Sequence, residues 1–298
     1  MEQFDVVVLG QGYAGLKAAE LAAASGLRTA SFEGAMAGGL VMSINELDPV
    51  PGGVATSGAE LTGAMAMANM DGGVETKFAA ASGLRRDGEG WIVTSEEGDC
   101  RAANVILATG ARLRKLGVPG EAELAGRGVS ECADCDGPLY QGKDGVIVGG
   151  GDSAFQEALA LAHYAANVTI VMRGESPRAR ADLVAAVAAA ANICVLPQTE
   201  VSAILGDAQA GVTGVRLRDA AGERVLDCAS VFVFIGLEAQ SQLLPGEAGR
   251  DAAGAVLTSQ TCATDLPGLW AIGAVRSGFG GLLSDAGDDA ARVIAALS

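Results

Sequence analysis

The amino-acid sequence predicts an α/β protein that contains two similar βαβ units, the second of them inserted into the first. An apolar run, a glycine-rich turn and an Ala/Leu-rich stretch follow one another near residue 10 and again near residue 150. Hydrophobic residues make up 50% of the chain but aromatic residues only 4%, which is typical of parallel sheets built from Val, Ile, Leu and Ala and covered by helices. With 298 residues, the chain is also about twice as long as a typical domain.

The first unit begins with an apolar strand at residues 6–9, which leads into Gly10-x-Gly12-x-x-Gly15. A helix is predicted next, at residues 16–25. A second strand follows at residues 28–32 and leads directly into Glu33. In this order the glycines permit a tight turn and a close backbone approach, the helix N-terminus faces a pyrophosphate, and the acid binds a ribose hydroxyl. The pattern therefore predicts a dinucleotide site in the first unit.

The second unit repeats this order with Gly149-x-Gly151-x-x-Ala154. Its strand, helix and second strand are predicted at residues 146–148, 155–165 and 168–172. This second glycine turn therefore predicts another dinucleotide site.

The second strand of this unit ends at Arg173 instead of an acid, and Arg178 and Arg180 come shortly after it. An arginine suits a 2′-phosphate better than a free ribose hydroxyl, because its guanidinium forms charge-assisted hydrogen bonds with phosphate oxygens. The second unit is therefore expected to bind NADPH in preference to NADH.

The first unit, whose motif ends at Glu33, suggests an FAD domain, and the second unit suggests a nicotinamide domain. A strand at residues 104–107 runs into Thr109-Gly110, and a late strand at residues 268–273 ends at Gly273 before a helix at residues 286–297. These late elements have no partners of their own, so we expect them to complete the first domain. The predicted architecture is two Rossmann-like dinucleotide-binding domains: an FAD-binding domain of residues 1–112 and 243–298, and an inserted NAD(P)H-binding domain of residues 114–241.

Charge and hydropathy exclude several classes of partner. The chain has 20 Lys and Arg against 36 Asp and Glu, a formal net charge of −16, so its surface repels nucleic acid. No stretch reaches 18 uninterrupted apolar residues, and Met1–Asp5 lacks the features of a signal peptide. We expect a soluble, cytoplasmic protein with no nucleic-acid or membrane partner.

Cys132 and Cys135 form a close CxxC pair, whereas the other cysteines are scattered singly. Zinc needs four ligands, and the chain offers no second CxxC and a single histidine, His163, for which a packed or surface position is expected. A redox dithiol is therefore favoured, with Asp136 beside it as a proton donor or acceptor. The single cysteines, Cys100, Cys194, Cys228 and Cys262, are expected to be buried small apolar residues.

At this point the sequence resembles the low-molecular-weight thioredoxin reductases, which are FAD-containing, NADPH-dependent disulfide reductases. The resemblance covers residues 6–297 and rests on both glycine motifs, the CxxC motif with its following Asp-Gly, Gly38-Gly39, Pro51-Gly52, Ala108-Thr109-Gly110 and Gly126-Arg127-Gly128-Val129-Ser130. It implies that Cys135 faces the flavin, that Cys132 attacks the partner disulfide and that Asp136 protonates a leaving thiolate. It also implies a homodimer in which one domain rotates against the other, so that nicotinamide and disulfide alternate at the flavin.

The sequence departs from this family mainly at flavin contacts. Leu40 follows the Gly-Gly pair where the family usually has Gln, Pro49 stands for an Asn, and Ala274 replaces the Asp of a Gly-Asp pair. Gly280-Gly281-Leu282 stands where the family has Arg-Gln-Ala, and Met172 replaces the His before the first nucleotide arginine. The implied consequence is a retained FAD with an altered ring environment.

The sequence therefore predicts an FAD-dependent dithiol–disulfide oxidoreductase, which passes electrons from NADPH through the flavin and Cys132/Cys135 to a thioredoxin-like protein. Arg127 is a candidate docking residue for that protein. Two alternatives stay open: a different circuit, as in a ferredoxin-linked reductase or a small-dithiol oxidase, and a non-catalytic, redox-responsive relative with a decayed flavin site. The visible spectrum of the purified protein distinguishes a flavoprotein from the last of these.

Overall fold

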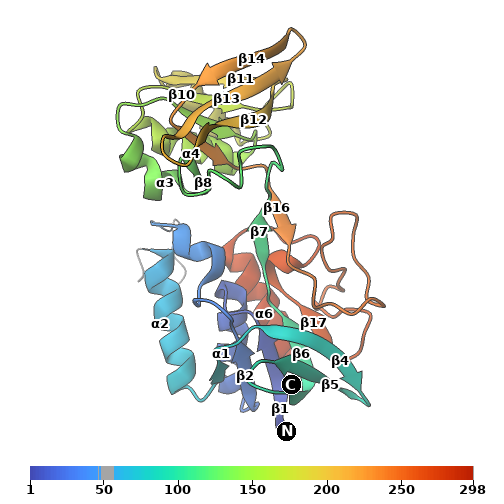
Figure 1. The fold of residues 1–298 in the computed structure, drawn as a ribbon. Helices are drawn as coiled ribbons and strands as arrows, with labels where there is room; N and C mark the ends of the chain where they lie inside the picture. Colours follow the sequence, from blue (N-terminus) through green and yellow to red (C-terminus); the bar gives the residue numbers. More distant parts are fainter. Residues whose placement is uncertain (46, 48–56, 298) are drawn as a thin grey trace. The chain divides into compact units, whose positions relative to one another are not determined.

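The computed structural model describes residues 1–45, 47 and 57–297, and its chain divides into two compact units (Figure 1). The first unit comprises Met1–Arg112 and Glu238–Ser298, and the second comprises Leu113–Leu237. Among the residues singled out in the sequence, Pro49 and Pro51-Gly52 lie outside the described part.

The first unit is built on a sheet with the strand order β3-β2-β1-β6-β5-β4, and β17 pairs with β6 in addition. The strands β3, β2, β1, β6 and β17 run parallel, whereas β4 and β5 form an antiparallel extension. Their bounds are β1 Glu2–Leu9, β2 Thr29–Phe32, β3 Glu75–Lys77, β4 Ala81–Asp87, β5 Gly90–Ser95, β6 Cys100–Leu107 and β17 Leu269–Ala271. The central strands are buried on both faces, as their continuous apolar runs indicate.

Helices α1 (Tyr13–Ala24), α2 (Gly58–Asp71) and α6 (Leu283–Leu297) belong to this unit, and α1 packs against both others. Helix α6 is amphipathic, and its buried residues are spaced three and four apart, so that they lie on one face. These residues are Ala286, Asp289, Ala290, Val293 and Ile294. Pairing of β17 with β6 and packing of α6 on α1 confirm that the C-terminal elements complete the first unit.

The second unit contains a fully parallel sheet of order β11-β10-β9-β15-β8 and an antiparallel sheet of order β12-β13-β14. The parallel strands are β8 Val129–Ser130, β9 Gly145–Val148, β10 Val168–Val171, β11 Ile193–Leu196 and β15 Ser230–Val233. The antiparallel strands are β12 Glu200–Asp207, β13 Gly211–Asp219 and β14 Gly222–Asp227. Helices α3 (Ala133–Asp136), α4 (Asp152–Ala162) and α5 (Ala181–Ala189) complete the unit, and Phe155, Leu161 and Phe232 lie in its core. The predicted α/β class with two βαβ units is confirmed.

The chain leaves the first unit along β7 (Ala111–Leu113) and returns along β16 (Leu237–Ala239), and these two strands pair. The predicted return at residues 241–243 lies a few residues later than the boundary between the two units. The difference arises because Gln240 is tied to the first unit: Thr109 Oγ1 donates to its carbonyl oxygen at 2.6 Å, and its own side chain donates to the Thr109 carbonyl at 2.9 Å.

The remaining predictions about single residues had mixed outcomes. Cys100, Cys228 and Cys262 are buried as expected, and His163 is exposed at the end of α4. The interpretation of Cys194 as a buried residue was wrong, because it lies exposed on β11, the edge strand of its sheet. In the described part of the chain, no helix is long and apolar enough to cross a bilayer.

Candidate active site

The glycine turn of the first unit is closed to side chains at Gly10 and Gly15 but open at Gly12. Gly10 has a φ of +104°, and its N–H donates to the carbonyl of Phe32 at 2.9 Å, which fixes the end of β1 against β2. A Cβ on Gly15 would lie 1.9 Å from the Gly10 carbonyl oxygen, so α1 can approach the turn only with glycine there. A Cβ on Gly12 would meet nothing closer than 4.0 Å. The backbone at Gly12 is therefore open to a ligand, as a pyrophosphate site requires.

Glu33 is held beside this turn at the end of β2. One carboxylate oxygen accepts the N–H of Gln11 at 3.0 Å, and the other accepts the N–H of Ala35 at 3.0 Å. Each oxygen keeps a second lone pair for a ribose hydroxyl. The position and chemistry of Glu33 therefore fit the dinucleotide role expected of it.

The structure brings the other predicted flavin-contact residues to the same turn. The N–H of Gly38 donates to the Gln11 carbonyl at 2.7 Å, and a Cβ on Gly39 would lie 3.4 Å from the Cα of Gly12. A Cβ on Gly273 would lie 2.9 Å from the Ala14 side chain at the start of α1. Thr109 and Gly110 follow β6, and the Thr109 Cα is 3.1 Å from the position of a Gly10 Cβ. These backbone segments form one cradle, which fits FAD.

Two residues at this site were missed in the sequence. Asp289, fully buried on α6, accepts the N–H of Gly273 at 3.0 Å and two guanidinium hydrogens of Arg276, at 2.6 Å and 2.7 Å. Asp289 and Arg276 together hold the short turn Gly273–Val275. Ala274, which stands where the family has a carboxylate, lies in this turn. Hydrogen bonding to Asp289 raises the pKa of Arg276. The available signal was an acid on the apolar face of an amphipathic helix, a position where carboxylates rarely stay without a partner.

The altered residues at the other flavin positions are small or exposed. Leu40 is 42% exposed in a 3₁₀ turn, Gly39–Ser43. A Cβ on Gly280 would lie 2.3 Å from Asp285 Oδ2, so this position is closed to larger residues unless Asp285 moves. Neither residue offers a polar side chain to a flavin ring.

The second glycine turn has the geometry of the first. Gly149 has a φ of +148°, and its Cβ would lie 2.2 Å from the Phe234 carbonyl oxygen. Gly151 precedes α4, and a Cβ there would meet nothing within 4 Å, whereas Ala154 is fully buried against the sheet. The turn is thus open on the ligand side and packed on the other.

The three arginines after this turn differ in what surrounds them. The N–H of Arg178 donates to the Gly150 carbonyl at 2.7 Å, which places Arg178 directly beside the turn. Arg180 pairs with Asp152 and Asp182 at 3.8 Å and 3.3 Å. Within the described residues, the exposed guanidinium groups of Arg173 and Arg178 form no hydrogen bond or ion pair, which leaves both for a phosphate.

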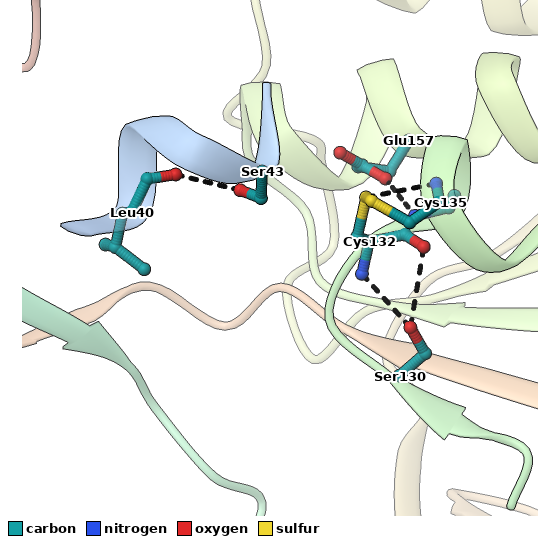
Figure 2. The surroundings of a disulfide bond; sticks show 7 residues. Leu40, Ser43, Ser130, Cys132, Cys135 and Glu157 are labelled. Carbon is teal, nitrogen blue, oxygen red and sulfur yellow. Dashed lines mark hydrogen bonds between the residues drawn. A yellow bond between two sulfur atoms is a disulfide. The ribbon is translucent and has the colours of Figure 1, made fainter. Parts of the chain in front are cut away.

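The cysteine pair is a disulfide at the start of α3, with 5.3 Å between the Cα atoms (Figure 2). Ser130 Oγ accepts the N–H of Cys132 at 3.1 Å, and the N–H of Cys135 points at Cys132 Sγ, also at 3.1 Å. Cys135 is exposed and Cys132 half-buried. This order of exposure is the reverse of what an attack by Cys132 requires, and the accessibility of the two thiols in the reduced pair stays a prediction.

Carboxyl groups surround the segment of residues 130–136, here called the redox turn. Asp136 ends α3 and is half-buried. Glu157, on α4, accepts the N–H of Ala133 at 2.6 Å, and burial raises its pKa. Glu157 was missed in the sequence, although it falls three residues after the buried Ala154 and so lies on the packed side of its helix.

A cavity of about 890 Å³ opens beside the redox turn, within the second unit. Its lining includes Ser130 and Asp136 from the turn, together with Glu123, Glu131 and Lys115. Lys115 and Glu131 pair with each other. The remaining carboxylates give the cavity an acidic lining.

Comparisons with known proteins agree with this arrangement. The family model described as pyridine nucleotide-disulphide oxidoreductase matches residues 4–290. The thioredoxin reductase of Treponema pallidum is 36% identical over 277 residues, which cover 92% of this chain and 89% of that protein. The bifunctional thioredoxin reductase/thioredoxin of Mycobacterium leprae is 37% identical over 276 residues, 90% of this chain and 59% of that longer protein. The crystal structure of Lactococcus lactis thioredoxin reductase superposes with a TM-score of 0.92 at 30% identity, covering 99% of this chain and 97% of that one.

Proposed function

Since the chain belongs to the pyridine nucleotide-disulphide oxidoreductase family, we propose that this FAD-dependent disulfide oxidoreductase reduces the disulfide of thioredoxin or a thioredoxin-like protein, with NADPH as electron donor. The observation that carries the proposal is the Cys132–Cys135 disulfide on a short helix in the same unit as the second glycine turn. Relatives named thioredoxin reductases, one of them a fusion with thioredoxin, support the choice of partner.

We assign the cofactors to the two glycine turns. The first unit holds FAD through Gly10, Gly12, Gly15 and Glu33, with Gly38, Gly39, Thr109, Gly110 and Gly273 around it. The second unit holds NADPH through Gly149, Gly151 and Ala154, and Arg173 and Arg178 bind its 2′-phosphate. When bound, the flavin serves as a two-electron carrier between the nicotinamide and the disulfide.

The cysteines carry out the exchange with the partner. The Cys132 thiolate attacks the partner disulfide, forms a mixed disulfide and releases one partner thiolate. Cys135 then attacks Cys132 Sγ, which restores the intramolecular disulfide and releases the second partner thiolate. Two electrons pass to the partner in total. Asp136 supplies a proton to a leaving thiolate.

The partner docks beside the redox turn in this proposal. The cavity adjoins Asp136 and is open to a polar loop of the partner. Arg127 follows Gly126, which lines the cavity. Its side chain is exposed and donates to the Ala208 carbonyl at 3.2 Å. Reversal of its charge, Arg127→Glu, should raise the KM for the partner and leave NADPH-dependent flavin reduction unchanged.

We propose that the protein is a homodimer, as the resemblance implies, and light scattering on the purified holoenzyme tests this. We also propose a cytoplasmic location, since a dithiol kept reduced by NADPH belongs to a compartment in which thiols stay reduced. Cell fractionation tests the location.

Single cysteine variants test the exchange itself. Cys132→Ser should abolish thioredoxin reduction while NADPH still bleaches the flavin. Cys135→Ser should trap a mixed disulfide between Cys132 and the partner, which mass spectrometry identifies. Full turnover by both variants would refute the dithiol mechanism. A flavin that thiols reduce but NADPH does not would instead favour a dithiol-oxidase or ferredoxin-linked circuit.

A further inference from the structure

Glu157 is a half-buried acid for which the proposed exchange has no role. It lies on α4, the helix that begins at the second glycine turn, and its side chain points at the first turn of α3 (Figure 2). There Oε2 accepts the N–H of Ala133 at 2.6 Å, the residue directly after Cys132. Ala133 is fully buried. This contact therefore joins the redox turn to the helix of the nucleotide site.

Other hydrogen bonds described at the redox turn join residues within it. The Cys132 N–H is held by Ser130, and the N–H of Asp136 donates to the Cys132 carbonyl at 3.1 Å. Since α3 is only 4 residues long, these local bonds give it little stability of its own. The bond from Glu157 anchors the turn to a longer and well-packed element.

The charge of Glu157 opposes reduction of the disulfide. Burial raises the pKa of Glu157, the Ala133 N–H lowers it, and the negative charge of Asp134 on α3 raises it again. Reduction of Cys132–Cys135 breaks the S–S bond and takes up two electrons, with one proton to give a thiol and a thiolate or with two protons to give two thiols. A thiolate beside an ionised carboxylate is unfavourable, because like charges repel.

We propose that Glu157 is a positioning residue that anchors the redox turn to α4 and whose charge sets how easily the Cys132–Cys135 disulfide is reduced. The inference rests on the proposed redox role of this pair. Glu157 touches neither sulfur through a hydrogen bond described in the structure, so it acts through the backbone of Ala133 and through its charge.

The test is a redox titration of the pair in the holoenzyme, in buffers of reduced and oxidised dithiothreitol, with thiols counted by alkylation and mass spectrometry. Glu157→Gln keeps an oxygen for the Ala133 N–H but removes the charge. It should raise the equilibrium constant for reduction roughly tenfold near pH 8, which corresponds to a midpoint about 30 mV more positive. The difference from the wild type should shrink as pH falls and Glu157 becomes protonated. Glu131→Gln is the matched control: it removes a charge one residue from Cys132 that is exposed to solvent and paired with Lys115. Because that charge is already screened, the variant should shift the midpoint much less.

Glu157→Ala separates anchoring from charge, because it removes the hydrogen bond as well. Hydrogen exchange of the Ala133 amide should be slow in the wild type and in Glu157→Gln, and faster in Glu157→Ala. Equal midpoints for wild type and Glu157→Gln at every pH would overturn the charge effect, and equal amide protection in all three proteins would overturn the anchor. A disulfide that no dithiol reduces in the wild type would refute the proposed function instead.

Discussion

The buried pair formed by Asp289 and Arg276 gives a sharp prediction about the flavin unit. The Asp289 side chain is completely inaccessible and that of Arg276 is 13% exposed, and the carboxylate also accepts the N–H of Gly273. Asp289→Ala leaves a mostly buried guanidinium without its partner, which costs about 3–5 kcal/mol in free energy of unfolding. For a unit of this size each kcal/mol lowers Tm by roughly 2–4 °C, so Tm should fall by at least about 6 °C.

A second arginine that pairs with Asp289 provides the control for this prediction. Arg292 also pairs with Asp289, at 2.9 Å, but its side chain is 46% exposed. Because exposed pairs contribute at most about 1 kcal/mol, Arg292→Ala should lower Tm by under about 4 °C. The assay is thermal unfolding with saturating FAD, followed by circular dichroism. Equal losses in the two variants, both below about 1 kcal/mol, would show that burial of the Asp289–Arg276 pair does not determine stability.

Three further predictions follow from the two glycine turns and the single cysteines. Arg178→Ala should weaken NADPH binding tenfold or more and hardly affect NADH, since a charge-assisted contact is worth about 1.5–3 kcal/mol, whereas Arg180→Ala should leave the ratio of the two affinities unchanged; titration of each nucleotide decides. Gly15→Ala should abolish FAD binding, because its Cβ would lie 1.9 Å from a backbone oxygen, while NADPH binding to the same protein persists; a yellow variant would contradict this. Iodoacetamide near pH 8 should label the exposed Cys194 but not the buried Cys228. Burial raises the pKa of Cys228 to about 12, which leaves only about one thiol in ten thousand ionised, and labelling of Cys228 in a peptide map would contradict this.

The sequence was sufficient for features that depend on local order. Strand, glycine turn and helix are adjacent in the chain, so both strand–turn–helix units were predicted where the structure has them. The completion of the first unit by the C-terminal elements was also predictable, since an apolar strand and an amphipathic helix without local partners must pack elsewhere.

Contacts between distant segments were not predictable from one sequence. Asp289 and Gly273 are 16 residues apart, and Glu157 and Ala133 are 24 apart. Nothing in the local pattern pairs a particular carboxylate with a particular N–H. The exposure of Cys194 had a similar cause, because only the strand order places β11 at the edge of its sheet.

In both units, carboxylates accept hydrogen bonds from backbone N–H groups that are distant in the sequence. Glu33 holds the N–H of Gln11 beside the first glycine turn, Asp289 holds that of Gly273, and Glu157 holds that of Ala133. Each of these N–H groups belongs to a turn to which we assign a cofactor or the redox disulfide, and regular secondary structure supplies no acceptor for it there. A charged acceptor binds an N–H more strongly than a neutral carbonyl does, so it fixes the turn without filling the space that the ligand needs. In a chain of net charge −16, some of the acidic excess therefore serves to hold functional turns in place rather than to solvate the surface.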